Sequence, residues 1–143
     1  MIVLAYDHRG YDLMQQIKKY LSVNELNYVE FGSELYNRDD SYSVYARQAC
    51  HYMTTSPNCV GIFSCGTGIG ISIAANRHKG IRAGLCADVE TTRQARNDDD
   101  INVLVLAGNT TTLTEAMAMI KTFLNTPFEG GRHIARLQLL DAD

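Results

Sequence analysis

The segment from residue 59 to residue 76 constrains the fold more than any other part of the chain. An apolar run, CVGIF at 59–63, leads into the glycine-rich stretch CGTGIG at 65–70, and residues 71–76 can continue as a helix. A strand that enters a glycine turn and then a helix presents backbone N–H groups at the positive helix end, where anions bind. Cys65 stands at the start of this turn, and a helix N-terminus favours the reactive thiolate. The segment therefore predicts an anion-binding turn beside an activated cysteine.

Simpler interpretations of the glycine turn stay open. A tight strand-to-helix turn needs no ligand, and Cys65 can be a buried structural cysteine. A dinucleotide site is disfavoured because the spacing is not GxGxxG, the turn follows the third predicted strand, and the chain has one small domain. A P-loop is excluded because no Gly-Lys-Ser/Thr follows the glycines.

Apolar runs alternate with amphipathic segments along the chain, which is typical of a parallel α/β sheet. The predicted strands are 2–6, 28–31, 59–63, 81–85 and 101–107. Five helices are predicted: around 13–21, at 44–53, from the glycine turn to about residue 78, from Asp88 through 95, and at 112–124. The inward residues of the last helix are predicted to be Leu113, Ala116, Met117, Ile120 and Phe123. We expect a three-layer, doubly wound, five-stranded and mainly parallel sheet in the order 2-1-3-4-5, with a partly helical C-terminal tail. At 143 residues the chain is expected to form a single domain, residues 1–143.

Two of the predicted turns fall on one edge of such a sheet. Asp7 and His8 follow the first strand, and Cys65 follows the third. Ligands of open α/β sheets bind beyond the carboxyl ends of the strands, and in the order 2-1-3-4-5 these two turns are neighbours. His8 can be a solvated turn residue, but beside Asp7 it can also be oriented as a phosphate donor or proton carrier. This edge is the candidate site.

Charged residues also gather before the last strand and in the tail. The run 97–100 carries three carboxylates, which oppose the dipole at a helix C-terminus, although they can also cap the helix or turn into the strand. Because the run precedes a strand, it lies at the edge opposite Cys65 and can reach a site only in a neighbouring subunit. A functional role for it therefore implies an oligomer. Arg132 and Arg136 share one face if the tail is helical, either as a solvated surface or converging on one phosphate.

Composition narrows the class of protein. Hydrophobic residues make up 45% of the chain and charged residues 20%, as in ordinary soluble proteins. A net charge of −3 argues against a nucleic-acid partner, which requires a basic face. No apolar stretch approaches the ~20 residues that span a bilayer, and the N-terminus lacks the basic region of a signal peptide. The four cysteines show neither CxxC nor zinc-finger spacing. We expect a reduced, cytoplasmic protein with no membrane partner and no structural metal.

The motifs together resemble the type B ribose-5-phosphate isomerase family, which includes subunits of galactose-6-phosphate isomerase. The shared residues run nearly end to end: they are Asp7-His8-x-Gly10, CGTGIG with Ser72, Ala74 and Asn76, GIRA at 80–83, Asn102-Val103 and GGRHxxR at 130–136. The resemblance implies isomerisation of a sugar phosphate from aldose to ketose through a cis-enediolate, without a metal or another cofactor. It also implies a homodimer or tetramer whose sites are shared between subunits.

The resemblance implies a role for each matching residue. Cys65 moves a proton between C1 and C2, and N–H groups of the glycine turn stabilise the enediolate oxygen as an oxyanion hole does. Thr67 assists ring opening or relays protons, Asp98 stands at the ring-opening position, and Arg132 and Arg136 bind the phosphate. The other substrate-binding residues are predicted to be Asp7, His8, Tyr42, Gly66, Gly68, Ile69, Gly70, Asp99 and Asn109.

The chain departs from the family pattern in the half of the site that opens the ring and selects the substrate. Asp98 and Asp99 stand where the family has His-Asn, and an ionised Asp98 can accept the anomeric proton but cannot donate one to the ring oxygen. Asn109 replaces an arginine, and Tyr42 has serine on both sides in place of Asp and Pro. Ribose 5-phosphate is the default substrate. The alternatives are a six-carbon aldose 6-phosphate of the galactose or allose type, and a weakly active binding subunit that needs a paralogous partner.

Overall fold

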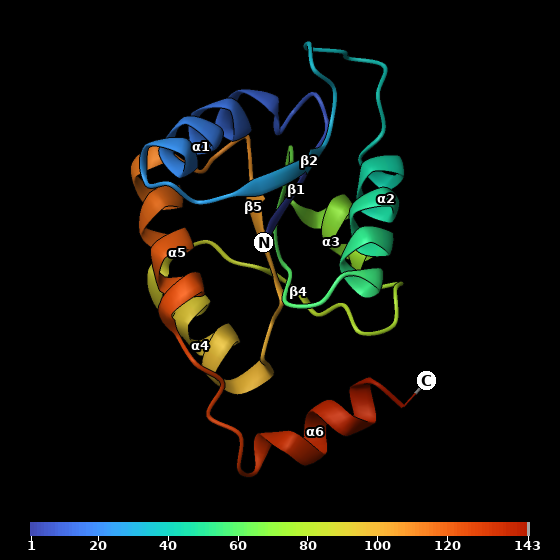
Figure 1. Cartoon of the computed structure of the whole chain (residues 1–143), viewed down its shortest axis with the longest axis vertical. Helices are drawn as coiled ribbons and strands as arrows, with labels where there is room; N and C mark the ends of the chain where they lie inside the picture. The colour runs from blue at the N-terminus through green and yellow to red at the C-terminus, as the bar shows by residue number, and fades with distance from the viewer. Residues whose placement is uncertain (143) are drawn as a thin grey trace.

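A five-stranded parallel β-sheet forms the centre of the computed structural model, which describes residues 1–142 (Figure 1). The strands are β1 (Ile2–Tyr6), β2 (Tyr28–Phe31), β3 (Val60–Cys65), β4 (Ala83–Leu85) and β5 (Val103–Ala107). They lie in the order β2-β1-β3-β5-β4, and each pairing is parallel. In this register Cys65 of β3 lies beside Ala107 of β5.

The strand order corrects one prediction. β5 lies inside the sheet and β4 at its edge, whereas the predicted order 2-1-3-4-5 has them the other way round. The first four residues of β5 are buried, as expected of a strand covered on both faces. β4 has only three residues, and Leu85 is 41% exposed. The longer apolar strand therefore takes the interior position and the short strand takes the edge.

Helices cover both faces of the sheet and confirm the three-layer fold. They are α1 (Tyr11–Val23), α2 (Tyr42–Thr55), α3 (Ile69–Ala75), α4 (Val89–Asp99), α5 (Leu113–Asn125) and α6 (His133–Leu140). α1, α4 and α5 lie on one face and α2 and α3 on the other, while α6 forms the expected helical tail at the end of the chain (Figure 1). Within residues 1–142, none of these helices combines the length and apolar character that a membrane span requires.

The three inner strands, β1, β3 and β5, are buried on both faces, which explains why they read as apolar runs. Successive side chains of a strand point to opposite faces. Ile2, Leu4 and Tyr6 of β1 therefore pack with α1 and α5. Val3 and Ala5 pack with α2 and α3 on the other face. The strands that carry the candidate site are thus held in the interior of the molecule.

Two helix ends differ from the predicted ones in a way that concerns the site. α2 begins at Tyr42, two residues before the predicted start, so Tyr42 belongs to its first turn. α4 continues through Asp99, so the acidic run forms its last turn. Arg82 and Arg96 donate to the Asp100 carboxylate at 2.8 and 2.7 Å, which offsets the repulsion between these acids and the helix dipole.

The starts of α4 and α5 follow the sequence closely. The Asp88 carboxylate accepts a backbone N–H of the first turn of α4 at 2.7 Å. Thr112 and Glu115 form a reciprocal capping box at the start of α5. The buried stripe of α5 runs through Met119, which the prediction missed, whereas Met117 is only partly buried.

Candidate active site

A pocket opens at the carboxyl ends of β1 and β3, on the sheet edge where the sequence predicts the site. Its volume is about 550 Å³, within the range of small-molecule pockets. Residues 7–9 after β1, residues 40–42 at the start of α2, and residues 65–67 and 69–70 after β3 line it. The turns after two neighbouring parallel strands meet here, as expected for an open α/β sheet.

Most of the predicted site residues lie in or beside this pocket. Those that line it are Asp7, His8, Tyr42, Cys65, Gly66, Thr67, Ile69 and Gly70. Gly68 lies behind the lining, with a φ of 77° at the start of α3, where a side chain would meet Leu85. Asn109 lies beside the glycine turn and donates its backbone N–H to the Gly66 carbonyl at 2.9 Å.

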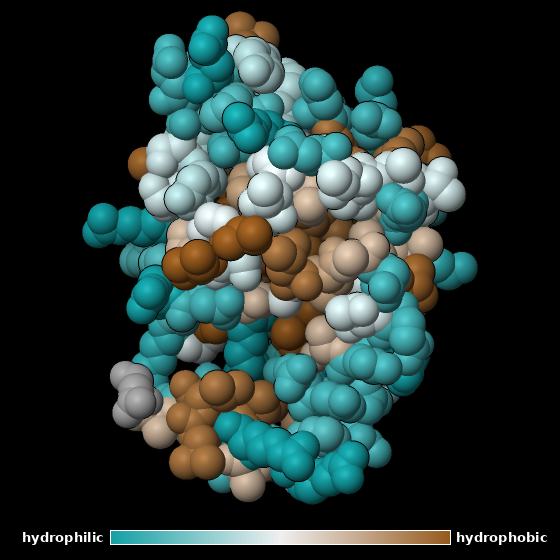
Figure 2. Space-filling model, turned by 180° about the vertical axis from the view of Figure 1, so that it is seen from behind, coloured by the Kyte–Doolittle hydropathy of each residue, from teal (hydrophilic) through white to brown (hydrophobic). Residues whose placement is uncertain are grey.

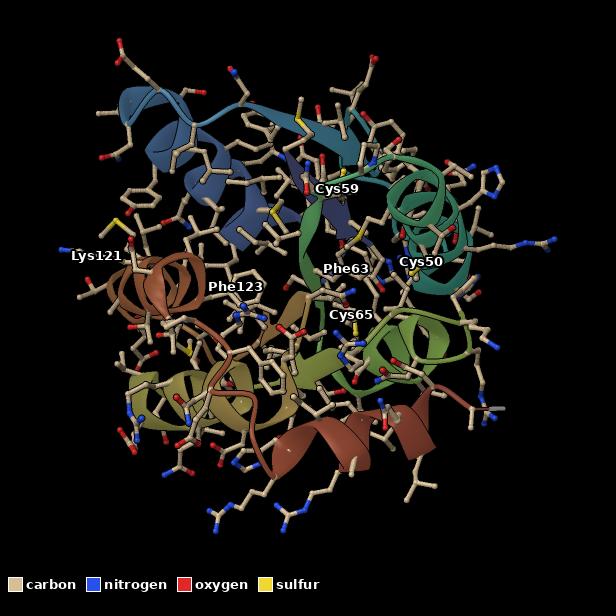
Figure 3. All side chains as sticks on the ribbon, turned by 60° about the horizontal axis from the view of Figure 1, so that its bottom comes forward. Cys50, Cys59, Phe63, Cys65, Lys121 and Phe123 are labelled. Carbon is tan, nitrogen blue, oxygen red and sulfur yellow. The ribbon has the colours of Figure 1, made fainter. Side chains whose placement is uncertain are left out.

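Cys65 is the last residue of β3 and is 4% exposed. Figure 3 shows its thiol at the end of the central strand, apart from Cys50 on α2. The Cys65 carbonyl accepts the N–H of Gly108 at 2.8 Å, so the turn after β5 holds this point in place. Thr67 Oγ1 accepts the N–H of Ile69 at 3.2 Å, which shapes the glycine turn.

Backbone contacts fix the turn after β1. Asp7 Oδ1 accepts the N–H groups of Arg9 at 2.9 Å and Gly10 at 3.2 Å. A Cβ on Gly10 would lie against the Ser64 carbonyl of β3. A Cβ on Gly108 would lie against the Arg9 carbonyl. Because only glycine allows these approaches, the turns after β1, β3 and β5 form one close-packed unit.

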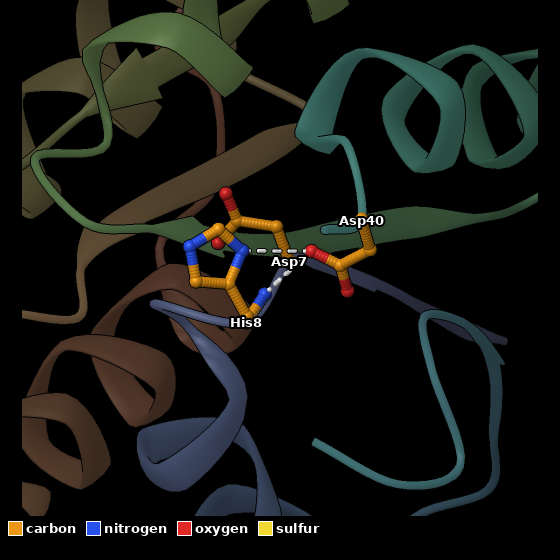
Figure 4. A group of neighbouring side chains, drawn as sticks. All are labelled: Asp7, His8 and Asp40. Carbon is orange, nitrogen blue, oxygen red and sulfur yellow. Dashed lines mark hydrogen bonds and ion pairs between the residues drawn. The ribbon is translucent and has the colours of Figure 1, made fainter. Parts of the chain in front are cut away.

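His8 is held by Asp40, which comes from the start of α2 (Figure 4). Asp40 Oδ1 lies 2.9 Å from both the backbone N and the Nδ1 of His8. Since a carboxylate oxygen accepts, Nδ1 carries the proton, and Nε2 is the ring nitrogen left for a ligand. The Asp40 side chain is 4% exposed, and its Oδ2 is buried with no partner in the described chain. The His8–Asp40 pair thus fixes both the ring orientation and its tautomer.

The other predicted residues lie at the opposite edge of the sheet. Asp98 and Asp99 form the last turn of α4, which ends just before β5 begins. Arg132 and Arg136 lie at the start of α6 and one turn into it. These four residues are not among those that line the pocket around Cys65. For Asp98 and Asp99 this is the placement that the sequence predicts within a single subunit. For Arg132 and Arg136 the sequence predicts a shared helical face but no particular edge of the sheet.

The buried residue His133, to which the sequence analysis gave no role, connects α6 to α4. Its Nε2 lies 3.2 Å from Glu129 Oε2 and 3.7 Å from Asp98 Oδ1. Its Nδ1 lies 3.4 Å from Arg136 Nη1. Since a guanidinium only donates, Nδ1 accepts and Nε2 carries the proton toward the carboxylates. Nε2 forms no hydrogen bond within residues 1–142, so the imidazole lies between the carboxylates of Asp98 and Glu129 and the guanidinium of Arg136 without joining them.

Within residues 1–142, two groups of side chains bring three possible metal ligands within 4.8 Å of one another: Asp7, His8 and Asp40, and Asp98, Glu129 and His133. In the first group, the Nδ1 proton of His8 already lies in a hydrogen bond to Asp40. In the second, a metal on Nε2 of His133 would place a proton on Nδ1, where it would face the donor group of Arg136. The geometry of the second group therefore does not favour a cation.

Three residues of the pocket lining were not predicted: Arg9, Asp40 and Ser41. Arg9 and Ser41 are next to the predicted residues His8 and Tyr42, and this proximity is their only signal in the sequence. Asp40 stands 32 residues from His8, in a polar loop without periodicity. Only the folded chain brings that carboxylate to the imidazole.

The open parallel sheet, with its pocket at the carboxyl ends of the strands, defines a doubly wound α/β protein with a small-ligand site. The profile of the Ribose/Galactose Isomerase family matches residues 2–140. The chain therefore belongs to this family, which confirms the resemblance found in the sequence.

Known relatives match over nearly the whole chain. The probable ribose-5-phosphate isomerase B of Mycoplasma pneumoniae is 38% identical over 136 residues, which are 95% of this chain and 90% of the relative. The crystal structure of a ribose 5-phosphate isomerase from Thermotoga maritima has a TM-score of 0.95 at 37% identity, covering 99% of this chain and 97% of that one. The ribose-5-phosphate isomerase B of Mycoplasma genitalium with bound ribulose-5-phosphate has a TM-score of 0.92 at 34% identity, covering 99% and 93%.

Proposed function

We propose that this chain interconverts ribose 5-phosphate and ribulose 5-phosphate. The position of Cys65 carries the proposal, because its thiol shares one pocket with the glycine turn and His8. Membership of the isomerase family and the related structure with bound ribulose-5-phosphate support the same reaction. In this reaction one proton moves from C2 to C1 and one hydroxyl proton moves from O2 to O1. No external oxidant or reductant is needed.

Cys65 acts as both base and acid. Its thiolate takes the C2 proton of the open-chain aldose to give the cis-enediolate, and the thiol returns that proton to C1. Backbone N–H groups between Gly66 and Gly70 stabilise the negative oxygen. The N–H of Ile69 is engaged by Thr67 Oγ1, so the other N–H groups of the turn serve the substrate. The Thr67 hydroxyl keeps its own proton available for a relay.

Asp7, His8 and Tyr42 orient the sugar above the thiol. Asp7 is immobilised by its own turn, and Asp40 leaves the Nε2 of His8 for a substrate oxygen. The Tyr42 ring lies over Gly70, where a Cβ would be 2.6 Å from its Cζ. These side chains come from two segments, the turn after β1 and the start of α2, which the hydrogen bonds from His8 to Asp40 hold together, so the sugar binds to a preformed surface.

A second copy of the chain completes the site. Asp98, Asp99, Arg132 and Arg136 lie at the far edge of the sheet, from which they can serve only a neighbouring subunit. Apolar residues gather in the middle of the face in Figure 2 and on the C-terminal helix at its lower end. The exposed apolar residues beside the pocket and on α6 are Ile69, Ile73, Ile134, Leu139 and Leu140. Such a surface supports a homodimer with shared sites.

Mixing two inactive variants tests the shared site. Cys65→Ala and Arg136→Ala damage different halves, so a mixed dimer has one intact site and one that carries both changes. Random mixing after mild denaturation should therefore restore up to about a quarter of the wild-type activity. The absence of any recovery from folded, mixed dimers would contradict a site built from two subunits.

Turnover by the purified protein tests the reaction itself. We expect isomerisation of ribose 5-phosphate within a panel of pentose 5-phosphates and hexose 6-phosphates. Cys65→Ala should lower kcat by about 10²–10⁴-fold, whereas Cys50→Ala, a buried cysteine on α2 outside the pocket, is the matched control. Turnover of a hexose 6-phosphate alone would reassign the substrate. A folded protein that isomerises no sugar phosphate of the panel would favour the alternative, a weakly active binding subunit that needs a paralogous partner.

A cytoplasmic location fits this function. All four cysteines are free, and unpaired thiols are typical of reducing compartments. Reduced thiols are also what the proposed chemistry requires, because an oxidised Cys65 cannot carry the proton.

A further inference from the structure

Arg9 brings an unpaired positive charge to the pocket. It stands between His8 and Gly10 and is the single lysine or arginine among the described residues that line the pocket. Its backbone N–H donates to Asp7 Oδ1 at 2.9 Å, so the main chain of Arg9 is fixed in position. Within residues 1–142 its guanidinium donates no hydrogen bond and makes no ion pair with a carboxylate. The charge is therefore available to a ligand.

Gly66 sets the path of the Arg9 side chain. Arg9 Cδ lies 2.7 Å, and its Cβ 3.4 Å, from the point that a Cβ on Gly66 would occupy. The aliphatic stem of Arg9 therefore lies directly over the backbone of the glycine turn. The amide nitrogen of Asn109 lies 3.2 Å from the same point. Because Asn109 is neutral, Arg9 supplies the charge on this flank of the turn.

The charges of the pocket require a cation for an anionic substrate. Asp7 and Asp40 both line it, and each uses one oxygen to accept two N–H groups of the protein. A phosphate dianion that enters the pocket meets the repulsion of these carboxylates. A guanidinium is suited to offset that repulsion, because it donates two parallel N–H groups to phosphate oxygens.

We propose that the Arg9 guanidinium binds the phosphate group of the substrate beside Asn109, in the same subunit as the Cys65 that performs the chemistry. This inference rests on the proposed function and adds a residue to the phosphate site. It makes Arg9 the residue that selects phosphorylated sugars from within the catalytic subunit. The phosphate end of the sugar is then anchored on the flank of the glycine turn whose N–H groups face the enediolate.

Three variants test the role of Arg9. Arg9→Gln removes the charge and keeps part of the stem, and Arg9→Lys keeps the charge without the forked geometry. Lys121→Gln removes the same charge from the exposed face of α5, away from Cys65 (Figure 3), and is the control. Arg9→Gln should raise the KM for ribose 5-phosphate about 10- to 100-fold with little change in kcat. The KM of Arg9→Lys should lie between those of the wild type and Arg9→Gln. The KM of Lys121→Gln should equal that of the wild type.

Inorganic phosphate is the probe that separates this inference from the reaction. Its affinity, measured by calorimetric titration, should weaken by a similar factor in Arg9→Gln and stay unchanged in Lys121→Gln. An unchanged KM together with unchanged phosphate affinity in Arg9→Gln overturns the inference, and so does a fall confined to kcat. Because the titration needs no turnover, phosphate binding through Arg9 in a protein that isomerises no sugar phosphate would refute the proposed function alone.

Discussion

Gly10→Ala should destabilise the protein through one steric conflict between backbones. Gly10 has φ −90° and ψ −7°, a conformation that alanine adopts freely, so the change introduces no torsional strain. The new Cβ would stand 2.7 Å from the carbonyl carbon of Ser64 and 3.0 Å from its Cβ, with the carbonyl oxygen closer still. Ser64 is paired with Tyr6 on one side and Leu106 on the other, so β3 cannot yield. The turn after β1 must move instead.

The magnitude follows from the kind of atoms in conflict. Overpacking in a well-packed interior costs about 1–3 kcal/mol, and a backbone carbonyl has no rotamer that relieves it. For a chain of this length 1 kcal/mol lowers Tm by about 2–4 °C. We therefore expect Gly10→Ala to lower Tm by about 2–12 °C, measured by circular dichroism. The same movement carries Asp7 and His8 away from Cys65, so isomerase activity should fall even at temperatures where the variant is folded.

Gly80→Ala is the matched control. Gly80 has φ 81°, and no atom lies within 4 Å of a Cβ built there, so this variant carries torsional strain without a steric conflict. It should cost about 1 kcal/mol and leave activity unchanged. A Gly10→Ala variant with wild-type Tm and activity would refute the argument that close backbone approach holds the pocket together.

Three further changes probe separate features. Asp40→Ala should lower kcat/KM about tenfold, because it removes the hydrogen-bond acceptor of His8 Nδ1. Asp40→Asn keeps an acceptor and should keep most of the activity. Equal losses of kcat/KM in the two variants would argue against orientation of His8 by a hydrogen bond. Thr112→Ala should lower the free energy of unfolding by about 1 kcal/mol in urea titrations because it removes a helix cap, whereas Thr112→Ser should not; identical midpoints for all three proteins would exclude this effect. Burial raises the pKa of the Cys50 thiol from 9.0 to about 12, so the stability it contributes is complete below pH 9 and is lost as the pH rises toward 12. Over that range the wild-type free energy of unfolding should fall more steeply than that of Cys50→Ala, by up to about 1.4 kcal/mol per pH unit; parallel curves would show that Cys50 stays unlinked to folding.

The parts of the fold that depend on local patterning were predictable from the sequence. Residues 2–6 form an apolar run and residues 28–31 are apolar except for Glu30, and the structure places β1 and β2 there. The carboxylate of Asp88 was expected to cap a helix because a polar residue precedes the helical pattern, and it does. The meeting of the turns after β1 and β3 also follows from chain direction, since parallel strands end on one edge.

Other features depend on contacts that no local pattern encodes. The predicted order places β4 next to β3, whereas β5 pairs with both β3 and β4, and this crossover is set by strand pairing in the folded sheet. The link from Asp40 to His8 spans 32 positions across a polar loop. The stem of Arg9 crosses Gly66 only because two turns approach each other in space. Such pairings become visible when the backbone path is known.

Because β5 separates β3 from β4, the sheet cannot be completed in the order of synthesis. Once residues 1–100 have left the ribosome, β2, β1 and β3 can pair, but one edge of β3 is bare and β4 has no neighbour. Residues 103–107 pair with β3 on one side and with β4 on the other, and they bring Ala107 beside Cys65. A nascent chain halted before residue 103 therefore exposes an unpaired strand edge that can pair with other chains. The last strand to emerge therefore both covers an edge that could pair with another chain and completes the packing around Cys65.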